Sequence, residues 1–243
     1  MGQLQRVARL SVGVLAVALT AGTARSGEAA VAFNPVTGAL ESAQAILETG
    51  SFQVLHQEQP EGTSLALTTE LSSGVADDLN PKIAVDELGN TSVVWWRSQD
   101  PPEVLYRTRD LPSGAWSDEV RISGDGEAAS RPTVAHDGAG VWILYQAQAE
   151  AGAELRAVHI GDDPEPIPPT VTIATTTSTG DLAVEVRSEE GKLWVTWVEG
   201  ESAIAWSQYD PQAQAWSEAQ VEPLAGSSAE VLRAAVRAIV LGS

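Results

Sequence analysis

Residues 193–198 read LWVTWV, and two earlier stretches share their character, VVWW at residues 93–96 and VWILY at residues 141–145. All three are rich in β-branched and aromatic side chains, which favour β-strands. They are apolar at nearly every position instead of at alternate ones, so both faces of each strand are expected to be buried. Strands of this kind are typical of sheets stacked face to face against neighbours on both sides.

The three strands recur at a near-constant spacing. Trp96, Tyr145 and Trp197, the aromatic residues that we align at the end of each strand, are 49 and 52 residues apart. A period near 50 is typical of blade-type repeats, in which each repeat forms one small antiparallel sheet. The chain is therefore expected to stack about three such units.

A second repeated feature is a tight turn followed by a bulky apolar residue. It is seen in RDLPSGAWSDEV, YDPQAQAWSEAQV and FNPVTGALESAQAI, which superimpose on Ala115-Trp116, Ala215-Trp216 and Ala39-Leu40. Asn, Asp, Pro and small residues favour such turns. Trp116 and Trp216 are therefore expected to open the last strand of their units, where packing explains their repetition better than sugar stacking does.

By the same comparison, the stretch around Asn34 is interpreted as the end of an earlier, incomplete unit whose front half is missing. Between it and Pro81 lie SFQVLHQ, residues 51–57, and TSLALTTEL, residues 63–71. These two runs are predicted to form an additional hairpin around Glu61-Gly62.

The repeats predict an all-β fold, a partial or small β-propeller of about three to four antiparallel blades over residues 31–226. A short amphipathic helix is predicted at residues 227–243, with Leu232 and Val236 on its apolar face. The alternative fold is a two-sheet β-sandwich, which explains the apolar strands less well because each of its sheets buries only one face. The ring either closes as a distorted four-bladed form or stays an open arc, whose unpaired edges favour self-association.

The first 24 residues have the features of a secretory signal peptide. Arg6 and Arg9 precede an uncharged stretch from Leu10 to Ala21, and small residues follow it. The stretch is about half the ~20 apolar residues that a membrane-spanning helix needs. The protein is therefore expected to be secreted or periplasmic, with no membrane insertion after removal of the signal.

The remaining chain is acidic and lacks cysteine. Without Arg6 and Arg9 it carries 12 basic and 33 acidic side chains, a net charge of −21. Such a surface repels phosphate backbones, so nucleic acid is not an expected partner. The absence of cysteine excludes disulfides and thiolate metal sites.

The repeat unit resembles those of sialidase-like (BNR, Asp-box) β-propeller proteins. The similarity is carried by Pro81-Lys82-Ile83-Ala84-Val85-Asp86, Gly89-Asn90, Val93-Val94-Trp95, and then Trp116-Ser117 with Val120. The Asp-box itself, Ser-x-Asp-x-Gly-x-x-Trp, is not matched, because no Ser stands at the required offset from Asp86. The resemblance therefore implies a fold class more than an activity.

No catalytic set is predicted. Sialidase-type hydrolysis needs an arginine cluster, a Tyr-Glu nucleophile pair and an acid. Arg131-Pro132-Thr133 is the nearest string to the Arg-Ile-Pro motif of that family, and it begins a repeat where a structural Pro is expected. Arg107 and Arg109 share one strand face, which is expected to be solvated. The three tyrosines, Tyr106, Tyr145 and Tyr209, are expected to pack within the repeats.

Neither a cofactor nor a metal site is predicted. His56, His136 and His159 lack the spacing of a transition-metal site. His136-Asp137-Gly138 coincides with the turn from Asp86 to Gly89 and is interpreted as turn chemistry. Oxygen-rich turns occur at Asp77-Asp78, at Asp86 with Asn90 and at Asp162-Asp163, but none follows a twelve-residue calcium loop.

The sequence thus predicts an exported, non-catalytic binding or interaction module whose partner is a glycan, a polymer or another protein. Its ligand-binding residues cannot be assigned from the pattern. The alternative is a diverged glycoside hydrolase of the sialidase-like type. A third reading is a fragment of a longer propeller, with assembly as its role.

Overall fold

The computed structural model describes residues 26–48, 50–72, 74, 76–150, 152–161, 167–176, 185–189, 192–200 and 203–223. The expected signal peptide and the expected C-terminal helix lie outside these residues. All regular elements within them are β-strands, so the all-β prediction is confirmed. Within this part of the chain no helix is long and apolar enough to cross a membrane.

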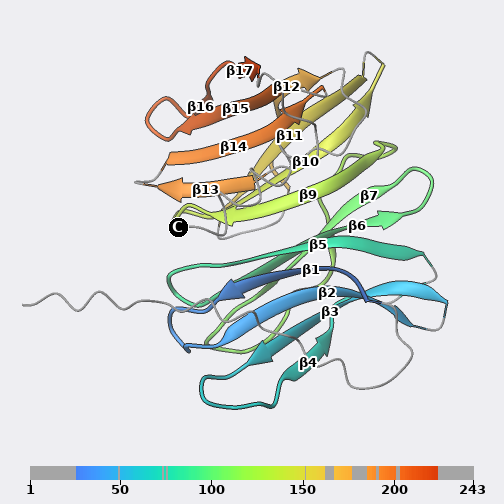
Figure 1. Cartoon of the computed structure of the whole chain (residues 1–243), viewed down its shortest axis with the longest axis vertical. Coiled ribbons are helices and arrows are strands. Elements are labelled where there is room, and N and C mark those ends of the chain that lie inside the picture. The colour runs from blue at the N-terminus through green and yellow to red at the C-terminus, as the bar shows by residue number, and fades with distance from the viewer. Residues whose placement is uncertain are drawn as a thin grey trace, which may run out of the picture.

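The strands form four antiparallel sheets (Figure 1). The first sheet contains β1 (Ser26–Phe33), β2 (Leu40–Glu48), β3 (Ser51–Gln59) and β4 (Leu67–Glu70). The second contains β5 (Asp77–Val85), β6 (Thr91–Ser98), β7 (Glu103–Arg109) and β8 (Val120–Arg121). The third contains β9 (Ala129–His136), β10 (Val141–Ala149), β11 (Gly152–Ile160) and β12 (Val171–Thr176). The fourth contains β13 (Glu185–Glu189), β14 (Lys192–Glu199), β15 (Ala203–Asp210), β16 (Ala215–Trp216) and β17 (Gln220–Pro223).

The sheets are stacked in chain order, from the first at the bottom of Figure 1 to the fourth at the top. Their leading strands β1, β5, β9 and β13 contact one another in turn. A separate apolar core fills each of the three interfaces between successive sheets. This is the predicted arrangement of propeller blades, and the two-sheet sandwich is not observed.

The strands around which the prediction was built are the second strands of the second, third and fourth sheets. Residues 93–96, 141–145 and 193–198 fall in β6, β10 and β14. Each of these strands pairs with a neighbour on both sides. The apolar side chains of β6 and β10 enter cores on both faces, as their composition predicted, whereas those of β14 enter only the core shared with the third sheet.

The prediction was wrong for the first sheet. Asn34 lies between β1 and β2 of a complete four-stranded sheet, instead of at the end of an incomplete unit. The predicted hairpin around Glu61-Gly62 is confirmed as the connection of β3 to β4. The local turn is nevertheless shared: Gly38 and Gly114 donate backbone hydrogen bonds to the carbonyl oxygens of Asn34 and Asp110. A similar turn sequence forms two different connections, β1 to β2 in the first sheet and β7 to β8 in the second. Local similarity alone therefore assigned the stretch around Asn34 to the wrong position in its sheet.

The alignment of the aromatic residues also requires a correction by one position. Trp95 packs into the core shared with the first sheet, whereas Trp96 packs on the opposite face, against the core shared with the third sheet. Tyr145 and Trp197 each face the preceding sheet, as Trp95 does. Adjacent residues of a strand point to opposite faces, so the structural counterpart of Tyr145 and Trp197 is Trp95.

Candidate functional site

Two similar turns face each other across the boundary between the second and third sheets. The turn from β5 to β6 begins with Asp86, whose carboxylate accepts hydrogen bonds from the backbone of Leu88 at 2.9 Å and of Asn90 at 2.7 Å. The turn from β9 to β10 begins with Asp137, which accepts from the backbone of Ala139 at 2.8 Å. Asp137 and Gly138 form this turn, as the interpretation of His136-Asp137-Gly138 as turn chemistry expected, whereas His136 is the last residue of β9.

The second turn approaches the end of β11 closely. A Cβ atom on Gly140 would lie 2.3 Å from the carbonyl oxygen of Ile160, so only glycine fits there. The carboxylate of Asp137 also accepts from the Trp142 indole at 2.8 Å and lies 3.3 Å from His159 Nε2. Burial would raise the pKa of Asp137, but the contacts with His159 and Trp142 outweigh burial and lower it to about 2. These contacts fix the position of the turn against β10 and β11.

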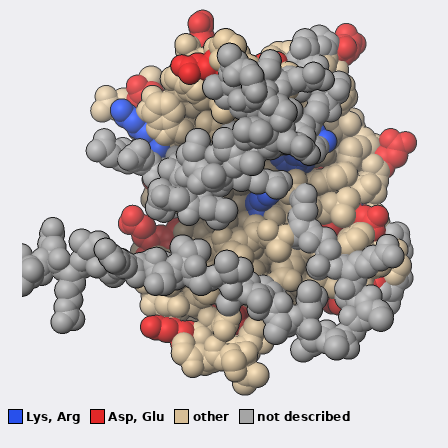
Figure 2. Space-filling model, in the orientation of Figure 1, with Lys and Arg blue, Asp and Glu red and all other residues tan. Residues whose placement is uncertain are grey.

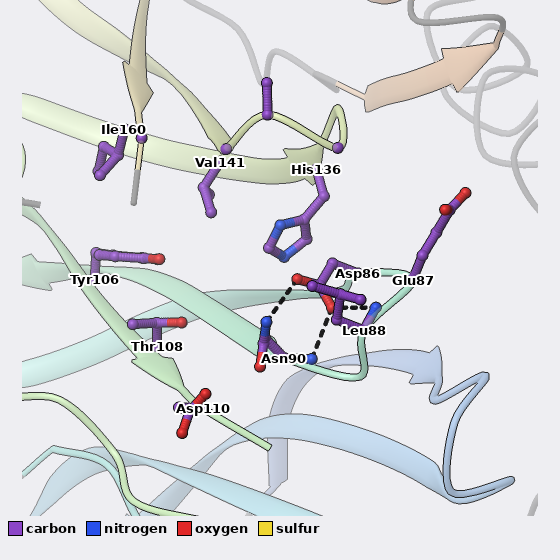
Figure 3. A pocket seen from close by; sticks show the side chains of 14 residues that line it. Asp86, Glu87, Leu88, Asn90, Tyr106, Thr108, Asp110, His136, Val141 and Ile160 are labelled. Carbon is purple, nitrogen blue, oxygen red and sulfur yellow. Dashed lines mark hydrogen bonds between the residues drawn. The ribbon is translucent and has the colours of Figure 1, made fainter. Parts of the chain in front are cut away.

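A cleft of about 500 Å³ opens between these turns and the ends of β7 and β11. Figure 3 shows the His136 ring reaching from the end of β9 toward the Asp86 turn, with Tyr106 and Thr108 pointing from β7 into the same space. Buried Val141 and Ile160 lie behind it, while Leu88 is 72% exposed at its rim. The cleft therefore has an apolar floor and a polar wall.

His136 is the residue of the cleft with unused hydrogen-bonding capacity. Its Nε2 is buried and has no hydrogen-bond partner within the described part of the chain. Burial lowers the pKa of His136, although the charge of Asp86 acts in the opposite direction. The imidazole is therefore neutral at neutral pH, and a neutral imidazole can donate or accept according to its tautomer.

The other polar groups of the cleft are mostly satisfied by the fold. Both carboxylate oxygens of Asp86 accept bonds from Asn90 or the turn backbone, and the Asn90 side-chain oxygen accepts from Leu111. The Tyr106 hydroxyl lies 3.2 Å from that of Ser92 and also interacts with the Thr108 side chain. Burial raises the pKa of Tyr106, so it stays protonated.

A buried polar cluster lies behind the Asp86 turn, at the boundary with the first sheet. Its centre is Glu41, whose side chain is fully buried. Asn34, Thr91 and Arg109 donate hydrogen bonds to its carboxylate at 2.7, 2.7 and 2.8 Å. His56 Nε2 lies 2.9 Å from the same group. Burial alone would raise the pKa of Glu41, but the His56, Asn34 and Thr91 hydrogen bonds and the Arg109 charge lower it.

This cluster supports the cleft from behind. Asn34 also donates to the carbonyl oxygen of Gly89, in the turn that carries Asp86. Arg109 binds Glu58 of β3 at 2.5 Å as well as Glu41 of β2, so it joins the first two sheets. The expectation that the Arg109 face is solvated was wrong, since Arg109 is only 8% exposed. Two sheet-borne carboxylates provide the charge that allows its burial.

Most of the other arginines are paired with carboxylates at the opposite ends of the strands. Arg97 donates to buried Asp78 at 2.9 Å and to Glu119 at 2.9 Å. Arg121 forms ion pairs with Glu103 and Asp125. Ion pairs within the fold are formed by Arg97, Arg109, Arg121 and Arg156.

One grouping includes a tyrosine and a glutamate. The Tyr145 hydroxyl donates to Glu127 at 3.4 Å, and Arg156 donates to the other oxygen of Glu127 at 2.9 Å and to Glu154 at 2.9 Å. Tyr145 is fully buried in the core between the second and third sheets. Burial, together with the charge of Glu127, raises the pKa of Tyr145 to about 12. The tyrosine therefore packs, as the sequence analysis expected.

Trp116 and Trp216 occupy matching places. Each pairs with a residue at the end of the third strand of its sheet, Arg109 (the last residue of β7) and Tyr209 (the last but one of β15), and each packs against the core shared with the preceding sheet. Trp116 contacts His56 edge to face, with ring centroids 5.0 Å apart, and Trp216 contacts Trp142 at 5.5 Å. Both are only partly exposed.

The cleft and the Glu41 cluster could not be recognised in the sequence. The cleft combines residues of two different sheets, His136, Tyr106 and Asp86. Their spacing along the chain does not indicate that they lie close together. The one available signal was the matching Asp-x-x-Gly and His-Asp-Gly turns, which mark equivalent ends of adjacent units. The oxygen-rich turns at Asp77-Asp78 and Asp86 are used in hydrogen bonds of the fold, and Asp162-Asp163 lies outside the described residues.

Comparison with known proteins shows the fold. The sequence matches no protein-family model and no curated protein. The structure is similar to the intramolecular trans-sialidase from Ruminococcus gnavus in complex with oseltamivir carboxylate, with a TM-score of 0.61 and 8% identity over 84% of this chain and 71% of that one. It is similar to a variant of the NanB sialidase from Streptococcus pneumoniae, with a TM-score of 0.59 and 7% identity over 82% of this chain and 52% of that one.

A third neighbour is the Trypanosoma rangeli sialidase in complex with the inhibitor DANA, with a TM-score of 0.53 and 10% identity over 79% of this chain and 37% of that one. The chain thus spans about half or less of the length of the second and third neighbours. At these identities the similarity concerns the backbone arrangement. The chain has a sialidase-like, propeller-type all-β fold.

Proposed function

We propose that the protein is an exported, non-catalytic binding module that holds its ligand in the cleft between the second and third sheets. The observation that carries this proposal is the pairing of the arginines: Arg97, Arg109 and Arg156 each bind two carboxylates of their own fold. Groups neutralised in this way cannot also hold a substrate carboxylate. The cleft supplies shape and hydrogen bonds, and no arginine lines it beside its carboxylates.

A glycan is the favoured ligand. The structural neighbours include sialidases in complex with oseltamivir carboxylate and with DANA, and a family 117 glycoside hydrolase from Zobellia galactanivorans with a TM-score of 0.52. A carbohydrate or a protein fits the proposal, whereas the strongly acidic composition disfavours nucleic acid. Figure 2 shows acidic side chains around the periphery of one face. The proposed location is secreted or periplasmic.

A diverged sialidase-like glycoside hydrolase is the second candidate. The contact of Tyr145 with Glu127, next to Arg156, is the observation that favours it. Against it, Tyr145 is fully buried and its pKa is raised to about 12, so its oxygen is neither accessible to a sugar nor readily ionised. Such a tyrosine is a poor nucleophile, and the binding role is favoured.

The test uses the chain after removal of residues 1–24. We expect the purified protein to bind members of a glycan array without releasing product from sialosides or other fluorogenic glycosides over prolonged incubation. Loss of binding in a variant that fills the cleft, Thr108→Trp, would support the location. Turnover that disappears in Tyr145→Phe would overturn the proposal in favour of the hydrolase.

A further inference from the structure

We infer that the cleft between the second and third sheets selects an uncharged, hydroxyl-rich ligand, a neutral saccharide, over an acidic one. This inference rests on the proposed function and adds the class of ligand. It is carried by the charge of the cleft lining, by the unused hydrogen-bonding atom of His136 and by the apolar floor.

The lining of the cleft carries negative charge without compensation. Among its residues Asp86, Glu87 and Asp110 are acidic, and none is a lysine or an arginine. A ligand carboxylate placed in this cleft would meet three like charges within a short distance, in a partly enclosed site where screening is weaker than in bulk water. The lining therefore disfavours acidic sugars, and Arg97, Arg109 and Arg156, which lie outside the lining, are paired with carboxylates of the fold.

The hydrogen-bonding groups that remain available suit a hydroxyl. His136 Nε2 is buried and unpartnered within the described residues, and the hydroxyls of Tyr106 and Thr108 line the same space. A sugar hydroxyl both donates and accepts, so it can satisfy a neutral imidazole in either tautomer. Leaving that buried nitrogen without a partner costs more than the net gain from an ordinary hydrogen bond, so a ligand that reaches it gains affinity.

The floor of the cleft suits the less polar face of a sugar ring. Val141 and Ile160 are almost fully buried and present aliphatic groups to the cavity. A volume of about 500 Å³ accommodates one or two sugar rings. The exposed side chains of Glu87 and Leu88 then lie at the entrance, where the rest of a longer saccharide would leave.

A cation is the main competitor for an acidic cleft. Within the described part of the chain, however, no group of three His, Asp or Glu side chains has the arrangement of a metal site. Both oxygens of Asp86 are occupied by the turn, and Asp110 accepts a backbone hydrogen bond from Ser113. The carboxylates therefore make the electrostatic potential of the cleft negative. Their hydrogen bonds within the turns leave few oxygens free to coordinate a cation.

The experiment compares neutral oligosaccharides of the gluco-, galacto-, manno- and xylo-series with analogues bearing one uronic or sialic acid, by calorimetric titration of the mature chain. We expect at least one neutral oligosaccharide to bind at least about tenfold more tightly than its acidic analogue at low salt. The difference between the two affinities is expected to become smaller at high salt, because salt screens the repulsion. His136→Ala is expected to weaken neutral binding by about tenfold, with the melting temperature recorded to separate binding from folding.

A charge reversal at the rim tests the inference without touching a buried residue. Glu87→Lys is expected to improve binding of the acidic analogues several-fold and to change neutral binding by less than about twofold. Glu218→Lys, an exposed position in the connection between β16 and β17, is the matched control and should change neither. Two outcomes would overturn the inference while the proposed binding function stands: acidic sugars that bind the unmodified chain as tightly as neutral ones or more tightly, and neutral binding that His136→Ala does not change. Hydrolysis of any of these saccharides would instead overturn the proposed function.

Discussion

At the level of single residues, burial of charge is the distinctive feature of this protein. Glu41 is 0% exposed, and the partners that surround it come from four different segments of the chain. A buried ion pair adds little net stability compared with an apolar core, but breaking it from one side leaves an uncompensated charge. The cluster therefore specifies how the first sheet docks on the second, and it does so next to the turn that forms one wall of the cleft.

Glu41→Gln tests this role of the buried carboxylate. Arg109 would keep only Glu58 as a charged partner, so the free energy of unfolding in urea is expected to fall by about 3 kcal/mol. Glu48→Gln, an exposed position on the same strand, serves as control and should change it by less than about 0.5 kcal/mol. Similar losses in both variants would show that the cluster has no special role.

Asp137 makes stability depend on pH at the other wall of the cleft. Its pKa in the folded protein is about 2, below the ordinary value of 3.8, so its carboxylate stabilises the fold above about pH 4 and loses this effect as the pH falls toward 2. The difference in unfolding free energy between the wild type and Asp137→Asn should therefore shrink as urea titrations are repeated at lower pH. Exposed Asp118→Asn is the control. A constant gap at all pH values would be inconsistent with this account.

At the level of the strands, the second strand of each sheet determines the packing. β6 and β10 place apolar side chains into the cores on both of their faces, so neighbouring residues of one strand belong to different interfaces, and β14 fills the core shared with the third sheet. Trp95 and Trp96 are adjacent in sequence and lie in the cores shared with the first and third sheets, respectively. Their different burial makes them a natural pair for measuring what each interface contributes.

Trp95→Ala is expected to destabilise the protein by about 3–5 kcal/mol, because a fully buried indole leaves a large cavity. Trp96→Ala should cost clearly less, since that side chain is only partly buried. Thermal and urea unfolding of the two variants provide the measurement. A larger loss for Trp96→Ala would mean that the register assigned to β6 is off by one residue.

At the level of the whole molecule, the stacking of sheets raises the question of what meets the two outer faces. Each inner interface is filled by side chains of two sheets, but the first and fourth sheets each contact only one other sheet among the described contacts. On β1, Val31 and Phe33 are 57% and 56% exposed. Exposed apolar side chains on a leading strand favour association with a further apolar surface.

We therefore expect the mature chain to self-associate, or to begin to do so when residues 227–243 are removed. Size-exclusion chromatography with light scattering at micromolar concentrations distinguishes these states from a monomer. Val31→Thr with Phe33→Thr should reduce the association, because it replaces the exposed apolar side chains with polar ones. If the mature chain and the shortened chain are both monodisperse monomers, the proposed self-association is excluded.

The sequence by itself determined the strand content, the repeat of about 50 residues and the stacking of sheets. These follow from properties of neighbouring residues, such as the apolar runs at 93–96, 141–145 and 193–198 and the turn residues between them. Such properties act over a few residues, so they can be read without knowing the rest of the chain. They do not distinguish Trp95 from Trp96, since a shift of one residue changes the face and leaves the composition unchanged.

Only the tertiary structure decided the candidate site. The cleft brings together Asp86, Tyr106 and His136, and the cluster behind it joins Glu41 to Arg109, which is 68 residues away. Whether an arginine is solvated or buried depends on which carboxylates another sheet places opposite it. That placement is set by how sheets dock, because docking creates long-range contacts that no local pattern encodes.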